Sequence, residues 1–324
     1  MSPRARTYVI VALAAAATAA LVVATVAFTR TSSGRPAPPP AQAQRPGGLP
    51  RLFLDLGVRV DPEARALRRA SALYDGRRPA AAGSIFRRYH SVQAQVGAAF
   101  ARWPSGTLAT LQRLARTHPR DPFVALQLGL ARFWRGDLAG ATQAWRAALA
   151  ADPNSASALH AEDFLHPNLP LGRPEFVPSF PFPPGLARLS PPRQFAALAR
   201  AARSGGPRAR ILYGVALQRL GEPLSAEREF EAAAAEAPGS PEALVAAAVG
   251  RFTKADPARA FSRLGPLAKR FPRSQTVRFH LGLLLLYIRD LPAARAELER
   301  ARRAAPRTVL GETANTLLVA ASRH

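Results

Sequence analysis

The stretch LGLARFWRGDLAGATQAWRAALAADPN, residues 128–154, decides the fold of this chain. Its apolar residues recur at helical spacing on both sides of a central Gly-Asp turn signal, which predicts two short helices joined as a hairpin. Gly129 lies twelve residues before Ala141, and these small residues let the two helices approach closely. Trp145 would fill the space between them, and Pro153, twelve residues after Ala141, would end the second helix.

The same spacing recurs three more times, and these three units follow one another at intervals of 34 residues. Each unit has Gly or Ala on the first helix, Ala on the second, then a larger apolar residue and a terminal Pro. The positions are Gly214, Ala226, Phe230 and Pro238; Ala248, Ala260, Leu264 and Pro272; and Gly282, Ala294, Leu298 and Pro306.

This pattern of small residues, a second-helix aromatic and a terminal Pro, at a period of 34, resembles the tetratricopeptide repeat family. The resemblance covers residues 122–155 and 207–308, and it is weaker where Ala248 replaces the usual Gly. A degenerate unit at 88–121 and an out-of-phase helix pair around 62–90 extend it toward the N-terminus.

The resemblance implies an all-α fold, a tetratricopeptide-like helical-hairpin solenoid, over residues 61–324. We expect residues 156–206 to be a third repeat that carries a Pro/Phe-rich insertion around 167–191, and residues 309–322 to be a C-terminal capping helix. The aromatic rings of the insertion either fold back on the solenoid as a plug or form an exposed arm that grips a partner. These rings belong to Phe176, Phe180 and Phe182.

Residues 7–29 carry no charge and are rich in Ala, Val and Leu. As a helix they would be about 34 Å long, enough to cross a hydrocarbon core of ~30 Å. We expect an uncleaved transmembrane helix preceded by a cytoplasmic tail at residues 1–6, with a cleaved signal peptide as the alternative. Arg4 and Arg6 favour a tail that stays in the cytoplasm, and long domains cross membranes largely regardless of their charge. The repeat domain is therefore expected outside the cytoplasm.

Residues 30–60 are expected to form a Pro-rich linker followed by an extended segment. Six prolines between residues 31 and 50 predict a semi-rigid spacer. Apolar side chains then recur at period two, which is typical of extended backbone. We expect them to bury against the solenoid, along its concave face or as a cap over the first helix pair; the alternative is the first turns of a helix. They are Leu52, Leu54, Leu56, Val58 and Val60.

The composition excludes several classes of protein. Hydrophobic residues make up 48% of the chain, which excludes global disorder. The absence of Cys excludes disulfides, Cys-ligated zinc and a thiol nucleophile. The net charge is +24, and 43 of the 45 basic residues are Arg, alongside many Ala and Pro, as in proteins of GC-rich bacterial genomes. We therefore expect a single-pass protein of a bacterial cell membrane.

No catalytic constellation is found in the sequence. It contains no nucleophile elbow, no phosphate-binding loop and no dinucleotide fingerprint. The one cluster of possible metal ligands is HAEDFLH at 160–166, in which His160, Asp163 and His166 spread over about 120° of a helix surface. We predict no catalytic residues, no cofactor and no metal, and hence a protein that is not an enzyme.

The resemblance also implies where a partner binds, since the first helices of tetratricopeptide hairpins line a concave face that usually holds a peptide. The Lys/Asn pattern that clamps a C-terminal carboxylate is missing, so that ligand is not carried over. The apolar lining predicts a hydrophobic ligand segment or a groove covered by the protein itself, and core packing is the alternative for any one residue. The candidates are Phe123, Gln127, Leu130, Trp134, Arg219, Phe252, Phe279, His280 and Tyr287.

Basic residues gather toward the membrane-proximal end. Residues 51–120 hold thirteen Arg and four acidic residues, whereas residues 221–301 hold twelve basic and ten acidic ones. We predict a membrane-tethered scaffold or adaptor that binds a protein or peptide partner. The alternative is an envelope factor whose basic repeats bind anionic lipid or polymer, while nucleic acid is unlikely because no aromatic side chains interleave with the arginines.

Overall fold

The computed structural model describes residues 48–322, and all regular structure in that range is helical. The helices fall into two compact units, an N-terminal unit at 48–165 and a C-terminal unit at 166–322. The predicted tail, transmembrane helix and most of the linker lie outside the described residues. Within residues 48–322, no helix has both the length and the apolar composition that a membrane crossing needs.

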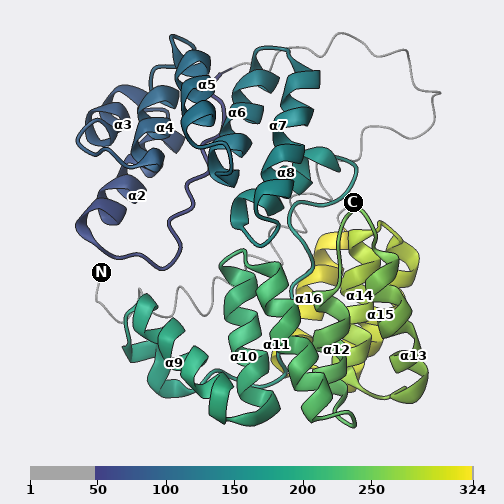
Figure 1. Cartoon of the computed structure of the whole chain (residues 1–324). Helices are drawn as coiled ribbons and strands as arrows, with labels where there is room; N and C mark the ends of the chain where they lie inside the picture. Colours follow the sequence, from purple (N-terminus) through teal and green to yellow (C-terminus); the bar gives the residue numbers. More distant parts are fainter. Residues whose placement is uncertain (1–47, 323–324) are drawn as a thin grey trace, which may run out of the picture. The chain divides into compact units, whose positions relative to one another are not determined.

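The N-terminal unit is a series of helices, each packed against the next along the chain (Figure 1). Three hairpins, α2–α3, α4–α5 and α6–α7, are followed by a single helix, α8, which packs on α6 and α7. The helices are α2 (Pro62–Asp75), α3 (Pro79–Phe86), α4 (Val92–Phe100), α5 (Thr107–Thr117), α6 (Pro122–Trp134), α7 (Leu138–Ala151) and α8 (Ala156–Leu165).

The C-terminal unit begins with an extended stretch and then repeats the hairpin arrangement. Helix α9 packs on α10, the hairpins α10–α11, α12–α13 and α14–α15 follow, and α16 packs on α14 and α15. The helices are η1 (Pro184–Arg188), α9 (Pro191–Ser204), α10 (Gly206–Arg219), α11 (Pro223–Glu236), α12 (Pro241–Gly250), α13 (Ala258–Arg270), α14 (Gln275–Tyr287), α15 (Leu291–Ala304) and α16 (Val309–Ser322). The predicted third repeat is thus divided, with α8 in one unit and α9 in the other.

Both helices of the α6–α7 hairpin begin with a cap that the sequence supplies. The carboxylate of Asp121 accepts from the backbone amides of Phe123 and Val124 and so satisfies free donors at the start of α6. Asp137 accepts from Gly140 N in the same way before α7. Gly136 takes a φ of 85° in the turn between the two helices, a conformation that glycine adopts without steric cost.

The predicted contact between paired helices is confirmed. A Cβ placed on Gly129 would lie 2.4 Å from Cδ1 of Trp145, and one on Gly214 would lie 2.4 Å from Cε1 of Phe230. Ala141 and Ala226, from the second helices of the same pairs, are fully buried. The small residues therefore make room for the rings, and the pattern of small and large residues sets the spacing of the helices.

Candidate functional site

In the N-terminal unit, an extended segment of the chain itself contacts the first helices of the hairpins. Residues 49–56, called here the N-terminal segment, contain no helix or strand. The hydroxyl of Tyr74 on α2 donates to Pro50 O at 2.7 Å, and Nε2 of Gln127 on α6 donates to Phe53 O at 2.6 Å. Leu52 is buried among the core residues of this unit. The N-terminal binding face is therefore formed by Tyr74, Gln127 and the side chains of α8 described next.

Phe53 contacts this face through its ring. Its centroid lies 4.2 Å from that of His160 and 6.1 Å from that of Phe164, both on α8. Burial raises the pKa of the neighbouring Asp55 carboxyl, while the amide of Gly57 opposes this shift. His160 therefore packs its ring against Phe53. Within residues 48–322, no group of side chains is arranged to hold a metal ion.

The expected burial of the period-two side chains is correct for Leu52 and Leu56, which are buried, and wrong for Val60, which is 39% exposed. Leu54 and Val58 are half-buried. The chain turns at Gly57, where φ is +48°, and Arg68 on α2 then donates to Gly57 O at 3.0 Å. This turn ends the period-two pattern of buried side chains. The other interpretation, that residues 51–60 form the first turns of a helix, is wrong because the first helix among the described residues begins at Pro62.

In the C-terminal unit, the Pro/Phe-rich insertion folds back on the hairpins. We call residues 173–182 the Pro/Phe segment. Phe176 is 1% exposed, and its ring stacks on His280 with centroids 4.7 Å apart and planes 12° apart. The same ring meets Phe230 at 5.7 Å, edge to face. Phe180 and Phe182 are half-buried against the same core. The plug interpretation is therefore correct for these rings.

Side chains from three first helices bind main-chain atoms of the Pro/Phe segment. Gln218 on α10 accepts from Phe176 N at 3.1 Å, and His280 on α14 accepts from Val177 N through Nε2 at 2.9 Å. Further contacts come from Tyr287, which donates to Arg173 O at 3.1 Å, and from Glu242, which accepts from Ser179 N at 2.7 Å. We call the side chains of Gln218, Glu242, His280 and Tyr287 the C-terminal binding face.

His280 has one protonation state that fits these contacts. Its Nδ1 lies 2.7 Å from Thr276 O and must donate, so Nε2 carries a lone pair that accepts from Val177 N. Burial lowers the pKa of His280 to about 4, against the opposing effect of the bond to Thr276. The imidazole is therefore neutral at physiological pH and acts as a hydrogen-bond bridge.

Charged groups flank the Pro/Phe segment. The Arg219 guanidinium lies 5.0 Å from the Phe182 ring centroid, and the Arg208 guanidinium lies 4.2 Å from that of Phe180. Burial raises the pKa of the Glu175 carboxyl and lowers that of Arg219, and the attraction between these two groups opposes both shifts.

The structure divides the predicted site residues into three groups. Gln127, Arg219, His280 and Tyr287 each contact an extended segment of the chain, as described above. Trp134 is half-buried, and its ring lies 6.5 Å from that of Trp103. The others are buried in the hydrophobic cores, so core packing accounts for them: Phe123, Leu130, Phe252 and Phe279.

Sequence reasoning missed three residues that bind the extended segments, namely Tyr74, Gln218 and Glu242. A signal existed for Gln218, because it follows Ile211 and Val215 at helical spacing on the same face of α10. Nothing in the sequence marks Glu242 or Tyr74 apart from other residues of their helices.

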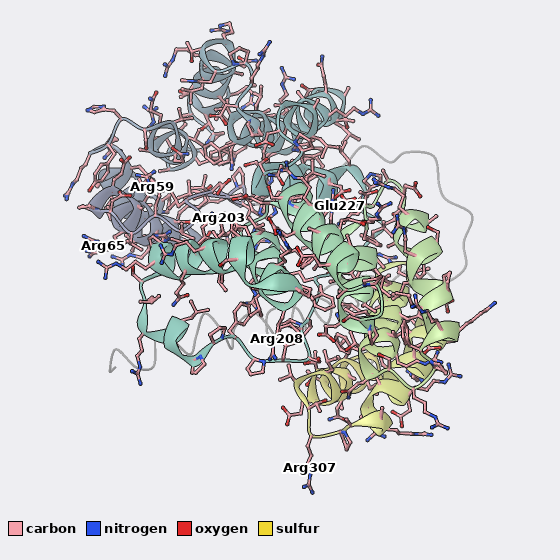
Figure 2. The ribbon with its side chains drawn as sticks, turned by 60° about the horizontal axis from the view of Figure 1, so that its bottom comes forward. Arg59, Arg65, Arg203, Arg208, Glu227 and Arg307 are labelled. Carbon is pink, nitrogen blue, oxygen red and sulfur yellow. The ribbon has the colours of Figure 1, made fainter. Side chains whose placement is uncertain are left out.

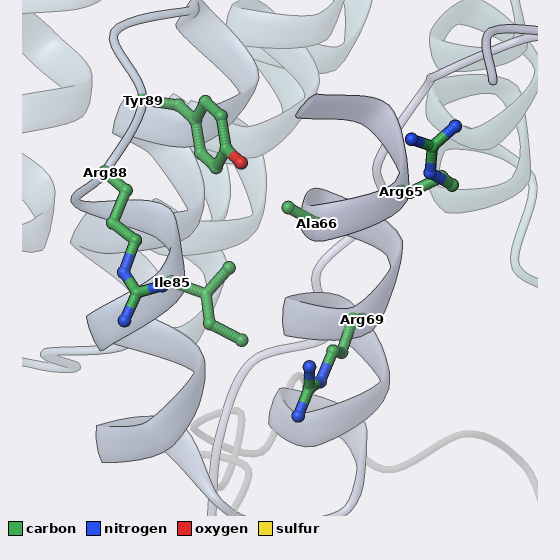
Figure 3. Close-up of a pocket in the computed structure, with 6 residues that line it drawn as sticks. All are labelled: Arg65, Ala66, Arg69, Ile85, Arg88 and Tyr89. Atoms are coloured by element: carbon green, nitrogen blue, oxygen red, sulfur yellow. The ribbon is translucent and has the colours of Figure 1, made fainter. Parts of the chain in front are cut away.

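A separate pocket of about 240 Å³ lies between α2 and the end of α3 (Figure 3). Arg65 and Arg69 line it from α2, and Arg88 and Tyr89 line it from the turn after α3. Among the described residues, no carboxylate forms an ion pair with any of these three arginines. Figure 2 shows Arg65 at the surface with Arg59, which pairs with Asp61 at 2.9 Å.

The two arrays of hairpins define an all-α protein with a tetratricopeptide-like fold. No protein-family model matches the sequence, and no curated protein matches it. The chain is similar to several solved structures, each with a TM-score below 0.5, so the fold assignment rests on the helix pairs described above.

One is a TPR2AB-domain:pHSP90 complex of yeast Sti1, with 11% identity, a TM-score of 0.31, and 80% of this chain and 98% of that chain covered. A tetratricopeptide repeat protein from Parabacteroides merdae has 12% identity and a TM-score of 0.33, with coverage of 80% and 98%. Yeast Tom70 has 13% identity and a TM-score of 0.32, with coverage of 93% and 69%.

Proposed function

We propose that this protein is a non-catalytic scaffold that binds an extended segment of a protein partner on the first helices of its hairpins. The observation that supports this is the binding of main-chain atoms by the two binding faces. Gln127 donates to Phe53 O, and Gln218 and His280 accept from consecutive amides. Such bonds recognise extended backbone in any sequence, so these faces have the chemistry of a peptide receptor.

Photocrosslinking in native membranes tests this proposal. A photoreactive amino acid replaces Trp134, seven residues after Gln127 on α6, or Arg219, next to Gln218 on α10. Matched controls carry it at the exposed Arg146 on α7 or Arg300 on α15. We expect a discrete crosslinked partner from the first two positions and none from the controls. Equal products from all four positions, or none from any, would contradict peptide binding on these faces.

We also propose that residues 7–29 anchor the protein in a bacterial cell membrane, with the repeats outside the cytoplasm. The uncharged length of this stretch supports the anchor. Intact-mass measurement of membrane-extracted protein should show the N-terminus retained, whereas a species beginning near residue 28 would indicate a cleaved signal peptide. Protease added to intact cells should digest the repeats.

A second candidate function is binding of anionic lipid or envelope polymer by the N-terminal unit. The pocket lined by Arg65, Arg69 and Arg88 favours it, because each cation near a lipid surface contributes about 1 kcal/mol. Sedimentation with phosphatidylglycerol vesicles at rising salt separates the two functions. Anionic binding should weaken steeply with salt and fall on changing Arg69 and Arg88 to Gln, whereas changing Arg300 and Arg303 to Gln should leave it unchanged.

A further inference from the structure

The Pro/Phe segment lies on the C-terminal binding face as a bound peptide would. Pro174, Phe176 and Pro178 are buried, Glu175 and Val177 between them are half-buried, and Ser179 is exposed. This alternation means that every second side chain points into the face, as in any extended strand. The buried positions spell Pro-x-Phe-x-Pro.

The contacts also fix a direction for the segment. Its first contact is to Tyr287, the last residue of α14, and its later ones are to Glu242, near the start of α12, and Arg208, near the start of α10. From Arg173 to Phe180 the segment therefore runs antiparallel to the first helices, from their C-terminal ends toward their N-terminal ends, whereas Phe182 lies beside Arg219 at the end of α10.

The central Phe carries the most specific recognition. Phe176 stacks on His280 and meets Phe230 edge to face, so the subsite has a flat aromatic wall on one side and a ring on another. The backbone amides of Phe176 and Val177 both donate hydrogen bonds to the face, which holds the Phe176 ring against His280. A smaller or aliphatic side chain would lose these ring contacts.

Prolines at the flanking positions suit the same face. Proline has no amide hydrogen to donate. The hydrogen-bond acceptors of the face bind the amides of residues 176, 177 and 179, so no acceptor is aligned with Pro174 or Pro178. The fixed φ of proline also keeps the segment extended before it binds, which lowers the entropy lost on binding.

We infer that the C-terminal binding face selects an extended partner segment of the pattern Pro-x-Phe-x-Pro, and that residues 174–178 occupy its subsites until the partner displaces them. This inference rests on the proposed scaffold function and specifies its partner. A competitor in the same chain has an effective concentration of the order of millimolar, so the partner binds the intact protein more weakly than it binds the uncovered face.

A peptide with the chain's own sequence tests the inference. Fluorescein-labelled RPEFVPSFPF, residues 173–182, is titrated against the full chain and against Phe176→Ala. We expect the peptide to bind the variant at least tenfold more tightly than the unchanged chain, and RPEAVPSFPF to bind the variant at least tenfold more weakly than RPEFVPSFPF. Equal binding by the two peptides, or equal binding to the two proteins, would overturn the inference.

Two further variants protect the test against misfolding of Phe176→Ala. A protease site placed at Pro183–Leu186, where Pro183, Pro184 and Gly185 are exposed, allows the segment to be cut free on one side without changing its buried residues. Cleavage should raise peptide affinity as the substitution does. On either background, Gln218→Ala should weaken binding several-fold because Phe176 N loses its acceptor, while Gln143→Ala on the exposed surface of α7 should not.

The peptide and crosslinking experiments can fail separately. A cellular partner that crosslinks at Trp134 or Arg219 but lacks the Pro-x-Phe-x-Pro pattern, together with no selective peptide binding, leaves the scaffold function standing and removes this inference. Selective peptide binding with no crosslinked partner would show that the face prefers this pattern, and it would contradict the scaffold function as proposed.

Discussion

Gly214 shows how a single residue sets the distance between two helices. A methyl group there would meet the Phe230 ring at 2.4 Å, well inside van der Waals contact. We therefore expect Gly214→Ala to lower the free energy of unfolding by about 1–3 kcal/mol through overpacking. Urea denaturation followed by circular dichroism measures the change.

Gly239, between α11 and α12, provides the matched control, since a Cβ at that position meets nothing within 4 Å. There the same substitution should raise the free energy of unfolding by about 0.4–1 kcal/mol, because alanine restricts the unfolded chain more than glycine does. If both substitutions shift stability in the same direction, the packing of α10 on α11 is not as described.

His280 makes the stability of the C-terminal unit depend on pH. Its pKa is about 4 in the folded chain, below the unfolded value of 6.5, so the unfolded chain binds a proton first as the pH falls. The stabilisation is complete above pH 6.5 and is lost between pH 6.5 and pH 4, by about 3 kcal/mol in all. Denaturant titrations at pH 7 and pH 4.5 measure this loss.

The variant His280→Gln isolates this effect from the titration of carboxylates elsewhere. At pH 7 the variant should be less stable than the unchanged chain, because the stack on Phe176 and the bridge from Thr276 to Val177 are altered. As the pH falls toward 4 the difference in free energy of unfolding should narrow, since only the unchanged chain carries the titrating imidazole. If the difference in free energy of unfolding stays constant with pH, the His280 ring is not buried in its neutral form in the folded chain.

Among the elements, the helical hairpins could be predicted from the sequence and the extended segments only in part. Gly129 and Trp145, or Gly214 and Phe230, are sixteen residues apart, so their pairing is written into a local repeat. The bond from Gln127 to Phe53 spans 74 residues and the one from His280 to Val177 spans 103, and no periodicity carries such pairings. The candidate site residues lie on first helices except Phe252, which follows the end of α12, and the sequence leaves their contacts with the chain itself as one of two interpretations.

The N-terminal segment should contribute to the core of its unit although it contains no regular structure. Leu52 is 5% exposed, so Leu52→Ala should lower the free energy of unfolding by about 2–4 kcal/mol through lost burial and a cavity. Val60, past the turn at Gly57, is 39% exposed, and Val60→Ala should change stability by no more than about 0.5 kcal/mol. Urea denaturation of both variants provides the comparison, and equal effects would mean that the segment does not dock.

At the scale of the whole molecule, most of the buried apolar residues within 48–322 fall into two clusters that share no member. One contains residues from Leu52 to Ala161, and the other contains residues from Phe176 to Leu317. Each cluster includes an extended segment that lies on the first helices of its own unit. Each unit therefore has what an independent domain needs, a hydrophobic core of its own.

Separate cores predict two unfolding transitions in differential scanning calorimetry of the chain. Because Leu52 belongs to one core and Gly214 packs into the other, Leu52→Ala should lower the midpoint of one transition and Gly214→Ala that of the second. Lowering the pH to 4.5 should lower the midpoint of the same transition that Gly214→Ala lowers, because the titrating His280 lies in the same unit as Gly214. A single transition lowered by both substitutions would instead show that the units unfold together, and displacement of the Pro/Phe segment by a partner would then change the stability of the whole chain.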